Sequence, residues 1–235
     1  MCSISWIVRE GGYELVFNRD EKWSRASSLD YTFETDHLVP GFCARDAQAR
    51  GTWLFTNEVG LTLAVFNAYP GNTLSPPSRQ TRGNIPLLAG EVESAQELVH
   101  LLERKCYDDF APFNLLLLCD SGAQSFGWDG NEFRKKAIGD LPFLTSSSVD
   151  SQRVIATRKR RFEQIRHLPL IEILSDTEAA KPEEAIYVTR KDGGTVSQTM
   201  VHVSQSKIHF SVTRRGEAQH FRSIPRKSLA SPNEL

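Results

Sequence analysis

The sequence predicts an α+β protein in which mixed or antiparallel sheets pack against helices. Segments with the alternation or the apolar runs of β-strands dominate both ends of the chain, and helical spacing of apolar residues is limited to two segments between them. Strands and helices do not alternate regularly, as they would in a sheet built from βαβ units, and no repeat occurs. This order favours antiparallel pairing, with helices packed on the sheets.

The composition is that of an ordinary globular protein. The chain has 235 residues, of which 40% are hydrophobic and 24% charged, so it is long enough to bury a substantial core. We predict one domain over residues 1–225 and a polar tail over 226–235. Since 28 lysines and arginines nearly balance 29 acidic residues, no overall field favours nucleic acid as a partner. No basic leader and no apolar run of about 20 residues occurs, so we expect a cytoplasmic protein without stable membrane insertion.

The first predicted element is a β-hairpin. Residues 2–9 and 13–20 carry strand-like patterns on either side of Gly11–Gly12, a dipeptide that accepts the positive φ angles of a tight turn. Residues 22–50 are polar and charged, and we predict that they form a long excursion over the surface. Excursions of this kind often supply the walls of a substrate pocket.

The later elements follow from the same signals. Residues 53–67 read as a second hairpin, and the proline-rich stretch after it reads as a loop. Leucines at helical spacing predict a helix over 92–105, and the continuous run Leu115–Leu118 suits a strand that is covered on both faces. The remaining predicted elements are strand-like segments over 113–120 and 124–130, a helix over 151–166, and strands over 185–190, 195–204 and 207–214.

Cys2 is the candidate site residue that the first hairpin produces. If Gly11–Gly12 form a two-residue turn, Cys2 lies opposite Glu21. Arg19 and Asp20 are then close to the thiol. Strict alternation along the strand puts Arg19 on the face of Cys2 and sends Asp20 to the other face, unless a bulge or the strand end rotates it.

An N-terminal Cys2 would combine a nucleophile with its own base. Removal of Met1 would free an α-amino group with a pKa of ~7.7–8.0, close to the ~8.5 of a thiol. The charge of Arg19 would lower the pKa of the thiol, and the Asp20 carboxylate would hold the amine by a hydrogen bond. The alternative is that Cys2 is only a small residue at the start of a strand, and that residues 18–21 are a solvated strand end.

Other cysteines and acidic residues have simpler explanations. Cys106 and Cys119 lie in apolar surroundings typical of reduced, buried thiols, and Cys43 is expected to be structural as well. Asp36 and Asp46, both within the predicted surface excursion, are expected to be solvated rather than catalytic.

The basic and histidine residues give no strong site either. The cluster of basic residues over 157–166 is interpreted as a solvated helix face, with an anion such as an acyl-coenzyme A as the alternative ligand. The histidines show no spacing typical of metal ligands, so we predict no metal and no cofactor, although haem ligation by one of them stays open. They are His37, His100, His167, His202, His209 and His220.

A set of motifs runs in order along most of the chain, most clearly before residue 120. Cys2 directly follows Met1, and residues 18–21 spell Asn-Arg-Asp-Glu. Further motifs are Gly51-Thr52-Trp53-Leu54, Gly60-Leu61 leading to Asn67, Arg82-Gly83, and Phe113-Asn114-Leu115. In these motifs and their order the sequence resembles the NRDE family, which includes the transport-and-Golgi-organisation proteins.

The resemblance implies the N-terminal-nucleophile hydrolase fold, a four-layer αββα sandwich of two antiparallel sheets covered by helices. Residues 60–71 are also similar to a stretch of choloylglycine hydrolases and penicillin acylases, which implies that Asn67 stabilises an oxyanion. The catalytic residues expected on this basis are Cys2, Arg19, Asp20 and Asn67. The expected substrate-binding residues are Asn18, Glu21, Trp23 and Tyr69.

Two positions depart from the family pattern. Where the family has an asparagine after a serine, this chain has Ser146, and where it has an arginine near the end, this chain has Val196. If this placement holds, one oxyanion donor and one cationic group of the site are missing.

The functional hypothesis is an N-terminal cysteine amidohydrolase that acts on a non-peptide C–N amide or a thioester. The alternative is a binding or trafficking protein for haem, lipid or acyl-coenzyme A that uses the same pocket with little or no turnover. In both cases the partner is a small amide, thioester or hydrophobic molecule, and a homo-oligomer stays open.

Overall fold

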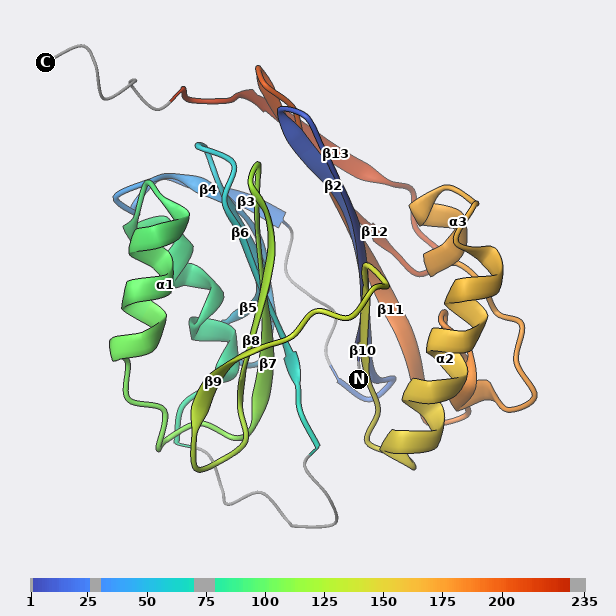
Figure 1. Ribbon diagram of the computed structural model, residues 1–235. Helices are drawn as coiled ribbons and strands as arrows, with labels where there is room; N and C mark the ends of the chain where they lie inside the picture. Colours follow the sequence, from blue (N-terminus) through green and yellow to red (C-terminus); the bar gives the residue numbers. More distant parts are fainter. Residues whose placement is uncertain (1, 26–30, 70–78, 229–235) are drawn as a thin grey trace, which may run out of the picture.

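The computed structural model describes residues 2–25, 31–69 and 79–228. Two antiparallel sheets lie face to face, and helices cover the outer face of each, so that the layers follow the order α, β, β, α (Figure 1). The predicted α+β class and the four-layer sandwich are therefore confirmed.

The first sheet has six strands in the order β10-β1-β2-β11-β12-β13. Their bounds are β1 (Cys2–Arg9), β2 (Gly12–Lys22), β10 (Phe143–Ser146), β11 (Gly193–Val203), β12 (Lys207–Arg214) and β13 (His220–Pro225). The second sheet has seven strands that pair in sequence order from β3 to β9. Their bounds are β3 (Tyr31–Glu34), β4 (Gly41–Arg45), β5 (Thr52–Asn57), β6 (Thr62–Asn67), β7 (Phe113–Cys119), β8 (Gly122–Trp128) and β9 (Phe133–Lys136).

The helices lie on the two outer faces of the sandwich. The second sheet is covered by α1 (Ala95–Arg104) and by the 3₁₀ segments η1 (Arg82–Asn84) and η2 (Pro86–Glu91). The first sheet is covered by α2 (Ser151–Ile165) and α3 (Leu170–Leu174), with η3 (Pro182–Glu184) beside α2. Ser94 and Glu97 form a capping box that fixes the start of α1.

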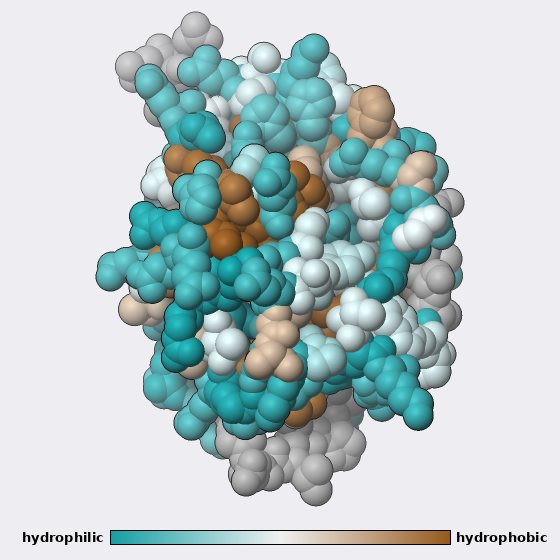
Figure 2. Space-filling model, turned by 90° about the vertical axis from the view of Figure 1, so that its right-hand side faces the viewer, coloured by the Kyte–Doolittle hydropathy of each residue, from teal (hydrophilic) through white to brown (hydrophobic). Residues whose placement is uncertain are grey.

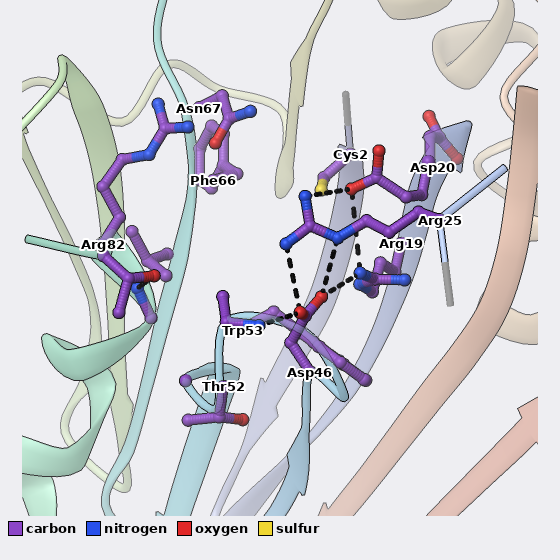
Figure 3. A pocket seen from close by; sticks show the side chains of 16 residues that line it. Cys2, Arg19, Asp20, Arg25, Asp46, Thr52, Trp53, Phe66, Asn67 and Arg82 are labelled. Atoms are coloured by element: carbon purple, nitrogen blue, oxygen red, sulfur yellow. Dashed lines mark hydrogen bonds and ion pairs between the residues drawn. The ribbon is translucent and has the colours of Figure 1, made fainter. Parts of the chain in front are cut away.

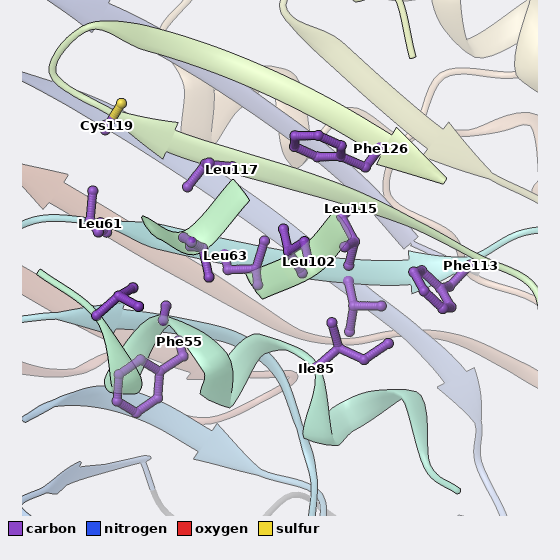
Figure 4. Packing of buried hydrophobic residues seen from close by; sticks show 14 of the residues in the cluster. Phe55, Leu61, Leu63, Ile85, Leu102, Phe113, Leu115, Leu117, Cys119 and Phe126 are labelled. Atoms are coloured by element: carbon purple, nitrogen blue, oxygen red, sulfur yellow. The ribbon is translucent and has the colours of Figure 1, made fainter. Parts of the chain in front are cut away.

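Three apolar layers hold the four structural layers together. In β7, Leu115 and Leu117 pack toward α1 whereas Leu116 and Leu118 pack between the sheets, as the continuous leucine run predicted. Figure 4 shows the layer between the second sheet and α1, where Leu102 faces the strand residues. The third apolar layer lies between the first sheet and the helices α2 and α3.

The first hairpin forms as predicted, but its register differs by two residues. Cys2 pairs with Arg19 instead of Glu21, because the chain reverses at Glu10 and Gly11, not at Gly11 and Gly12. Gly11 has the positive φ of 76° that the turn needs. Gly12 already belongs to β2, where a Cβ atom would lie 1.9 Å from the carbonyl oxygen of Val203 in β11. Since the shift is even, the faces of the strand are kept.

Several other segments differ from the sequence-based predictions. Residues 22–50 are not only a surface excursion, because they include the strands β3 and β4. The predicted strand over 185–190 is absent, since this segment forms only an isolated bridge between Thr189 and Gly194. The strand β13 (His220–Pro225), a segment for which no element was predicted, pairs with β12. The short helix α3 was not predicted.

The thiols are free, and one of them lies elsewhere than predicted. Cys43 and Cys119 are buried, as expected, whereas Cys106 is exposed. Cys106 follows the end of α1 and is not part of the apolar layer formed by its neighbours Leu102 and Tyr107.

The face formed by α2 and α3 is mainly hydrophilic around one apolar area (Figure 2). Lys159 and Arg160 of α2 are exposed, as a solvated basic helix face requires. Among the residues that the structure describes, no helix combines the length and the apolar character needed to cross a bilayer.

Glu34 in β3 gives a prediction for the acid stability of this fold. Burial alone would oppose its ionisation, but hydrogen bonds from Arg45, Cys43 and His37 outweigh burial and lower the pKa of the carboxyl to about 2. An unfolded Glu titrates near 4.3, so the stabilisation by ionised Glu34 should be complete above about pH 4.3 and be lost as the pH falls toward about 2. Urea unfolding of the wild type and of Glu34→Gln should give free energies that converge over this range. A difference that stays constant with pH would contradict the assignment.

Candidate active site

A pocket opens between the two sheets at the end where β1 begins (Figure 3). Its cavity volume is about 150 Å³. The walls come from β1, β2, β5, β6, η1 and the segment that joins β4 to β5, which are far apart in the sequence. The lining residues are Cys2, Arg19, Asp20, Glu21, Arg25, Asp46, Ala49, Gly51, Thr52, Trp53, Val65, Phe66, Asn67, Thr81, Arg82 and Gly83.

Cys2 is held from both sides because β1 is an inner strand. Its Cα pairs with Ser146 of β10 and with Arg19 of β2. The Cys2 backbone nitrogen donates to Ser146 Oγ at 3.2 Å, and Thr145 Oγ1 donates to the Cys2 carbonyl oxygen, also at 3.2 Å. Strand alternation then directs the half-buried thiol toward the space between the sheets, on the side of Ile4.

The surroundings of the thiol favour its protonated form. Burial is the largest effect and raises the pKa of Cys2, and the charge of Asp20 raises it further. The backbone N–H of Asp20, which donates to the sulfur, and the charge of Arg19 act in the opposite direction but do not outweigh burial. Arg19 therefore lowers the pKa of the thiol, as the sequence predicted. The net effect of all the surroundings, however, is a raised pKa.

Asp20 points to the other face of the first sheet, as strict alternation requires. Its Oδ1 accepts a hydrogen bond from Thr195 Oγ1 at 2.7 Å, and its Oδ2 lies 4.0 Å from Nη1 of Arg158. The partner strand β11 has a bulge between Thr195 and Ser197 at this point. The backbone N–H of Asp20 thus lies on the side of the Cys2 thiol, whereas its carboxylate lies on the side of helix α2, beside Arg158.

Arg158 is a charged residue at the site that the sequence analysis missed. It belongs to the basic helix α2, but its side chain is completely buried beneath β1 and β10. Nη1 donates to Thr145 Oγ1 at 2.7 Å and to Ser3 Oγ at 3.2 Å, and Nη2 donates to the Glu183 carbonyl oxygen at 2.9 Å. Because it faces the Asp20 carboxylate, Arg158 supplies the positive charge behind the strands that carry Cys2.

A network of ion pairs forms one wall of the pocket. Arg19 and Arg25 both bind Asp46, and Arg25 does so with Nε at 3.1 Å and Nη2 at 3.0 Å. Glu21 lies 3.7 Å from Arg19 and 3.5 Å from Arg25. Arg19 also stacks over the ring of Trp53, with the guanidinium carbon 5.0 Å from the ring centroid.

Asp46 is therefore not solvated, in contrast to the sequence-based expectation. It is buried, and its Oδ1 also accepts from the backbone nitrogen of Ala49 at 2.7 Å. Burial opposes ionisation, but the hydrogen bonds from Arg25 and Ala49, together with the charge of Arg19, hold the pKa of Asp46 below its usual value. The carboxylate is ionised at neutral pH and orients both arginines.

The opposite wall comes from the second sheet. Asn67 ends β6, and its Nδ2 donates to the hydroxyl of Tyr69 at 3.1 Å. Arg82 in η1 is half-buried, and Nη1 donates to the carbonyl oxygen of Pro112 at 2.9 Å. Figure 3 shows Asn67 and Arg82 across the cavity from Cys2.

Three of the expected substrate-binding residues do not line the pocket. Asn18 is buried on the outer face of the first sheet, where Nδ2 donates to the carbonyl oxygens of Leu174 at 2.7 Å and of Ile186 at 3.2 Å. Trp23 donates to the Arg190 carbonyl oxygen at 3.0 Å and lies outside the lining. Tyr69 contacts Asn67 but is not itself part of the wall. Of this expected set, only Glu21 lines the cavity.

Glu34, Asp36 and His37 form a further group whose ligand atoms lie within 4.8 Å of one another. Arg45 and Cys43 already bind the Glu34 carboxylate, and His37 also contacts Glu91 at 3.3 Å. Glu34 and His37 therefore belong to an ion-pair network, separate from the pocket.

The fold and the position of this pocket define a class of proteins. Two facing antiparallel sheets with outer helices, and a site at the start of an inner strand, form the N-terminal-nucleophile hydrolase fold, and solved structures of that fold are similar to this chain. A mutant of conjugated bile acid hydrolase from Clostridium perfringens matches with a TM-score of 0.61 and 11% identity, over 96% of this chain and 92% of that one. A variant of the same enzyme gives 0.56 and 11%, over 100% of both chains. An N-acylethanolamine-hydrolyzing acid amidase orthologue from Caenorhabditis elegans gives 0.54 and 12%, over 85% and 92%.

The sequence itself identifies the family. The model of the family Transport and Golgi organisation 2 matches residues 1–216, and the chain belongs to that family. A search of curated protein sequences found no match. At 11–12% identity, the structural similarity establishes the fold alone.

Proposed function

We propose that the protein is an N-terminal-nucleophile hydrolase that cleaves a non-peptide amide or a thioester with Cys2. The observation that carries the proposal is the pocket itself, which gathers Cys2, Arg19 and Asn67 from three strands around one small cavity. The cytoplasmic location expected from the sequence belongs to the same proposal.

The chemistry begins with a proton transfer inside one residue. Removal of Met1 frees the Cys2 amine, whose reference pKa of ~7.7–8.0 suits a base at neutral pH. A thiol whose pKa is raised by burial needs such a base. In this scheme the nitrogen lies where it now donates to Ser146 Oγ, so Ser146 orients the amine. The Asp20 carboxylate, held by Arg158 and Thr195, gives the amine a negative electrostatic environment.

The amine takes the thiol proton while the sulfur attacks the carbonyl carbon, which forms a C–S bond and an oxyanion. Asn67 has a second N–H beyond the one given to Tyr69, and that N–H donates to the oxyanion. Collapse of the tetrahedral intermediate expels an amine or a thiol, which takes the proton from the Cys2 ammonium. Water then hydrolyses the acyl-thioester and restores the starting state.

A second candidate function is binding or trafficking of haem, lipid or acyl-coenzyme A without turnover. Two observations favour it. Ser146 stands where the family resemblance leads one to expect an asparagine, and Val196 stands in place of an arginine. Val196 lies at the bulge of β11 and is absent from the pocket lining. A site with fewer oxyanion donors and cations stabilises a transition state less.

Intact-mass spectrometry after rapid mixing with acyl thioesters tests the proposal. We expect a native protein that lacks Met1 and a transient acyl adduct that peptide mapping assigns to Cys2. Exposed Cys106 serves as the internal control, because non-specific acylation would appear there first. Retention of Met1, or an adduct on Cys106 without one on Cys2, would rule out the hydrolase and leave the binding function.

A further inference from the structure

The three arginines that line the pocket differ in their partners. Arg19 and Arg25 both bind Asp46 and both lie within ion-pair distance of Glu21. Their charges are largely balanced within the wall. Arg82 faces the same cavity, yet within the described part of the chain no carboxylate lies within ion-pair distance of its guanidinium. Its hydrogen bond goes to a neutral group, the carbonyl oxygen of Pro112.

Arg82 is also held in a fixed place. It begins the 3₁₀ segment η1, whose first turn is capped by Thr81, and the next residue is Gly83. Gly83 abuts Gly51, the residue before β5, so closely that a Cβ on Gly51 would lie 2.7 Å from the Cα of Gly83. The bond to Pro112 fixes the other end of the side chain. A cation in a fixed, half-buried position is typical of a ligand-binding group, because little entropy is lost when it binds.

The electrostatics of Arg82 also favour a role in ligand binding. Burial lowers the pKa of the guanidinium, so its charge is poorly solvated, and negative charge at Tyr69, Cys2 or Glu21 would raise the pKa again. A ligand anion in the cavity would have the same compensating effect. Asp20, the third acidic residue of the lining, lies beside the charge of Arg158. Among the described lining residues Arg82 is therefore the cation without a carboxylate partner, and a group with a single negative charge complements it.

We propose that Arg82 binds a carboxylate of the ligand and thereby selects small acyl compounds that carry one acid group. Planar carboxylates accept two parallel hydrogen bonds from a guanidinium, which sets the orientation of the ligand. The carboxylate then sits on the wall of the second sheet, while the carbonyl group faces Cys2 on the first. This inference rests on the proposed site around Cys2, but it does not depend on whether the site catalyses turnover.

The electrostatic part can be tested by alkylation of Cys2 with two reagents that differ in charge. Peptide mapping gives the rate of Cys2 alkylation by anionic iodoacetate and by neutral iodoacetamide. Because the Arg82 cation attracts the anionic reagent, we expect the ratio of the iodoacetate rate to the iodoacetamide rate to fall about tenfold in Arg82→Gln. The wild-type ratio should be kept in Arg82→Lys, because lysine retains the positive charge. Arg79→Gln is the matched control, since Arg79 is exposed and outside the pocket.

The selection of acids can be tested by protection. N-acetylglycine and N-acetylglycinamide differ only in the charged end, and each is titrated against the iodoacetamide labelling of Cys2. We expect N-acetylglycine to protect at a roughly tenfold lower concentration, and this advantage to vanish in Arg82→Gln. Equal protection by both compounds, or a rate ratio that is the same in Arg82→Gln and Arg79→Gln, would overturn the inference.

The two proposals fail in different ways. If acids protect Cys2 but no thioester forms an acyl adduct, the anion site stands and the hydrolase does not. If thioesters acylate Cys2 but acids have no advantage, the hydrolase stands and Arg82 has another role.

Discussion

Replacing Cys2 by alanine should abolish turnover of acyl amides and thioesters, with a loss on the order of 10⁴ or more in kcat. The reason is that the sulfur of Cys2 is the proposed nucleophile. Alanine keeps the amine and the strand pairing of Cys2 with Ser146 and Arg19 but removes the atom that forms the covalent bond. Steady-state assays on a panel of short acyl amides and thioesters measure the loss.

Cys106→Ala is the matched control, because Cys106 is exposed and lies outside the pocket. It should leave turnover unchanged. If Cys2→Ala retains turnover, Cys2 is not the nucleophile. If neither the wild type nor Cys2→Ala turns over any compound while both bind acyl ligands equally, the protein is a binding protein.

The second large effect is expected at Arg158. Replacing it by methionine should destabilise the fold by about 3–5 kcal/mol, because the buried Asp20 carboxylate then loses the neighbouring charge of Arg158. Arg158 is 0% exposed and Asp20 only 4%. Chemical denaturation gives the difference in the free energy of unfolding.

Arg160→Met provides the control from the same helix, since Arg160 is exposed. Its effect should stay within about 0.5 kcal/mol. Adding Asp20→Asn to Arg158→Met should recover part of the lost stability, because both charges are then absent. If the double variant is as unstable as the sum of the single ones, Arg158 stabilises the fold by packing and not by its charge.

Much of the fold could be predicted because its signals are local. The leucine run of β7 and the helical spacing of the leucines in α1 need no knowledge of distant residues. The register of the first hairpin was not accessible in this way. Which of two adjacent glycines makes the turn is decided by β11, whose Val203 carbonyl leaves no room for a side chain at Gly12. The edge strand β13 is almost entirely exposed, so it lacks the alternation that marks a half-buried strand.

In the candidate site, too, some residues could be predicted from local signals and others could not. Cys2, Arg19 and Glu21 share a face because of strand periodicity, which the sequence contains. The role of Asp46 depends on Arg19 of β2, and on Arg25 just beyond β2, reaching it from the other side of the pocket, and no local pattern indicates this. The burial of Arg158, in contrast, could have been predicted from the sequence.

The signal for Arg158 lies in the helix α2. Val154, Arg158, Phe162 and Ile165 follow one another at helical spacing, and all four are buried. An arginine on an otherwise apolar stripe predicts a buried cation with a partner, which a simple count of basic residues hides.

The contact between Gly51 and Gly83 has a consequence for tolerance to mutation. The backbones touch where two motifs that are separate in the sequence meet, and a methyl group on either glycine would collide with main-chain atoms of the other segment. Even alanine, the mildest replacement, should push η1 and Arg82 away from Cys2. Substitutions at these two glycines should therefore impair the pocket although neither residue offers a side chain to it.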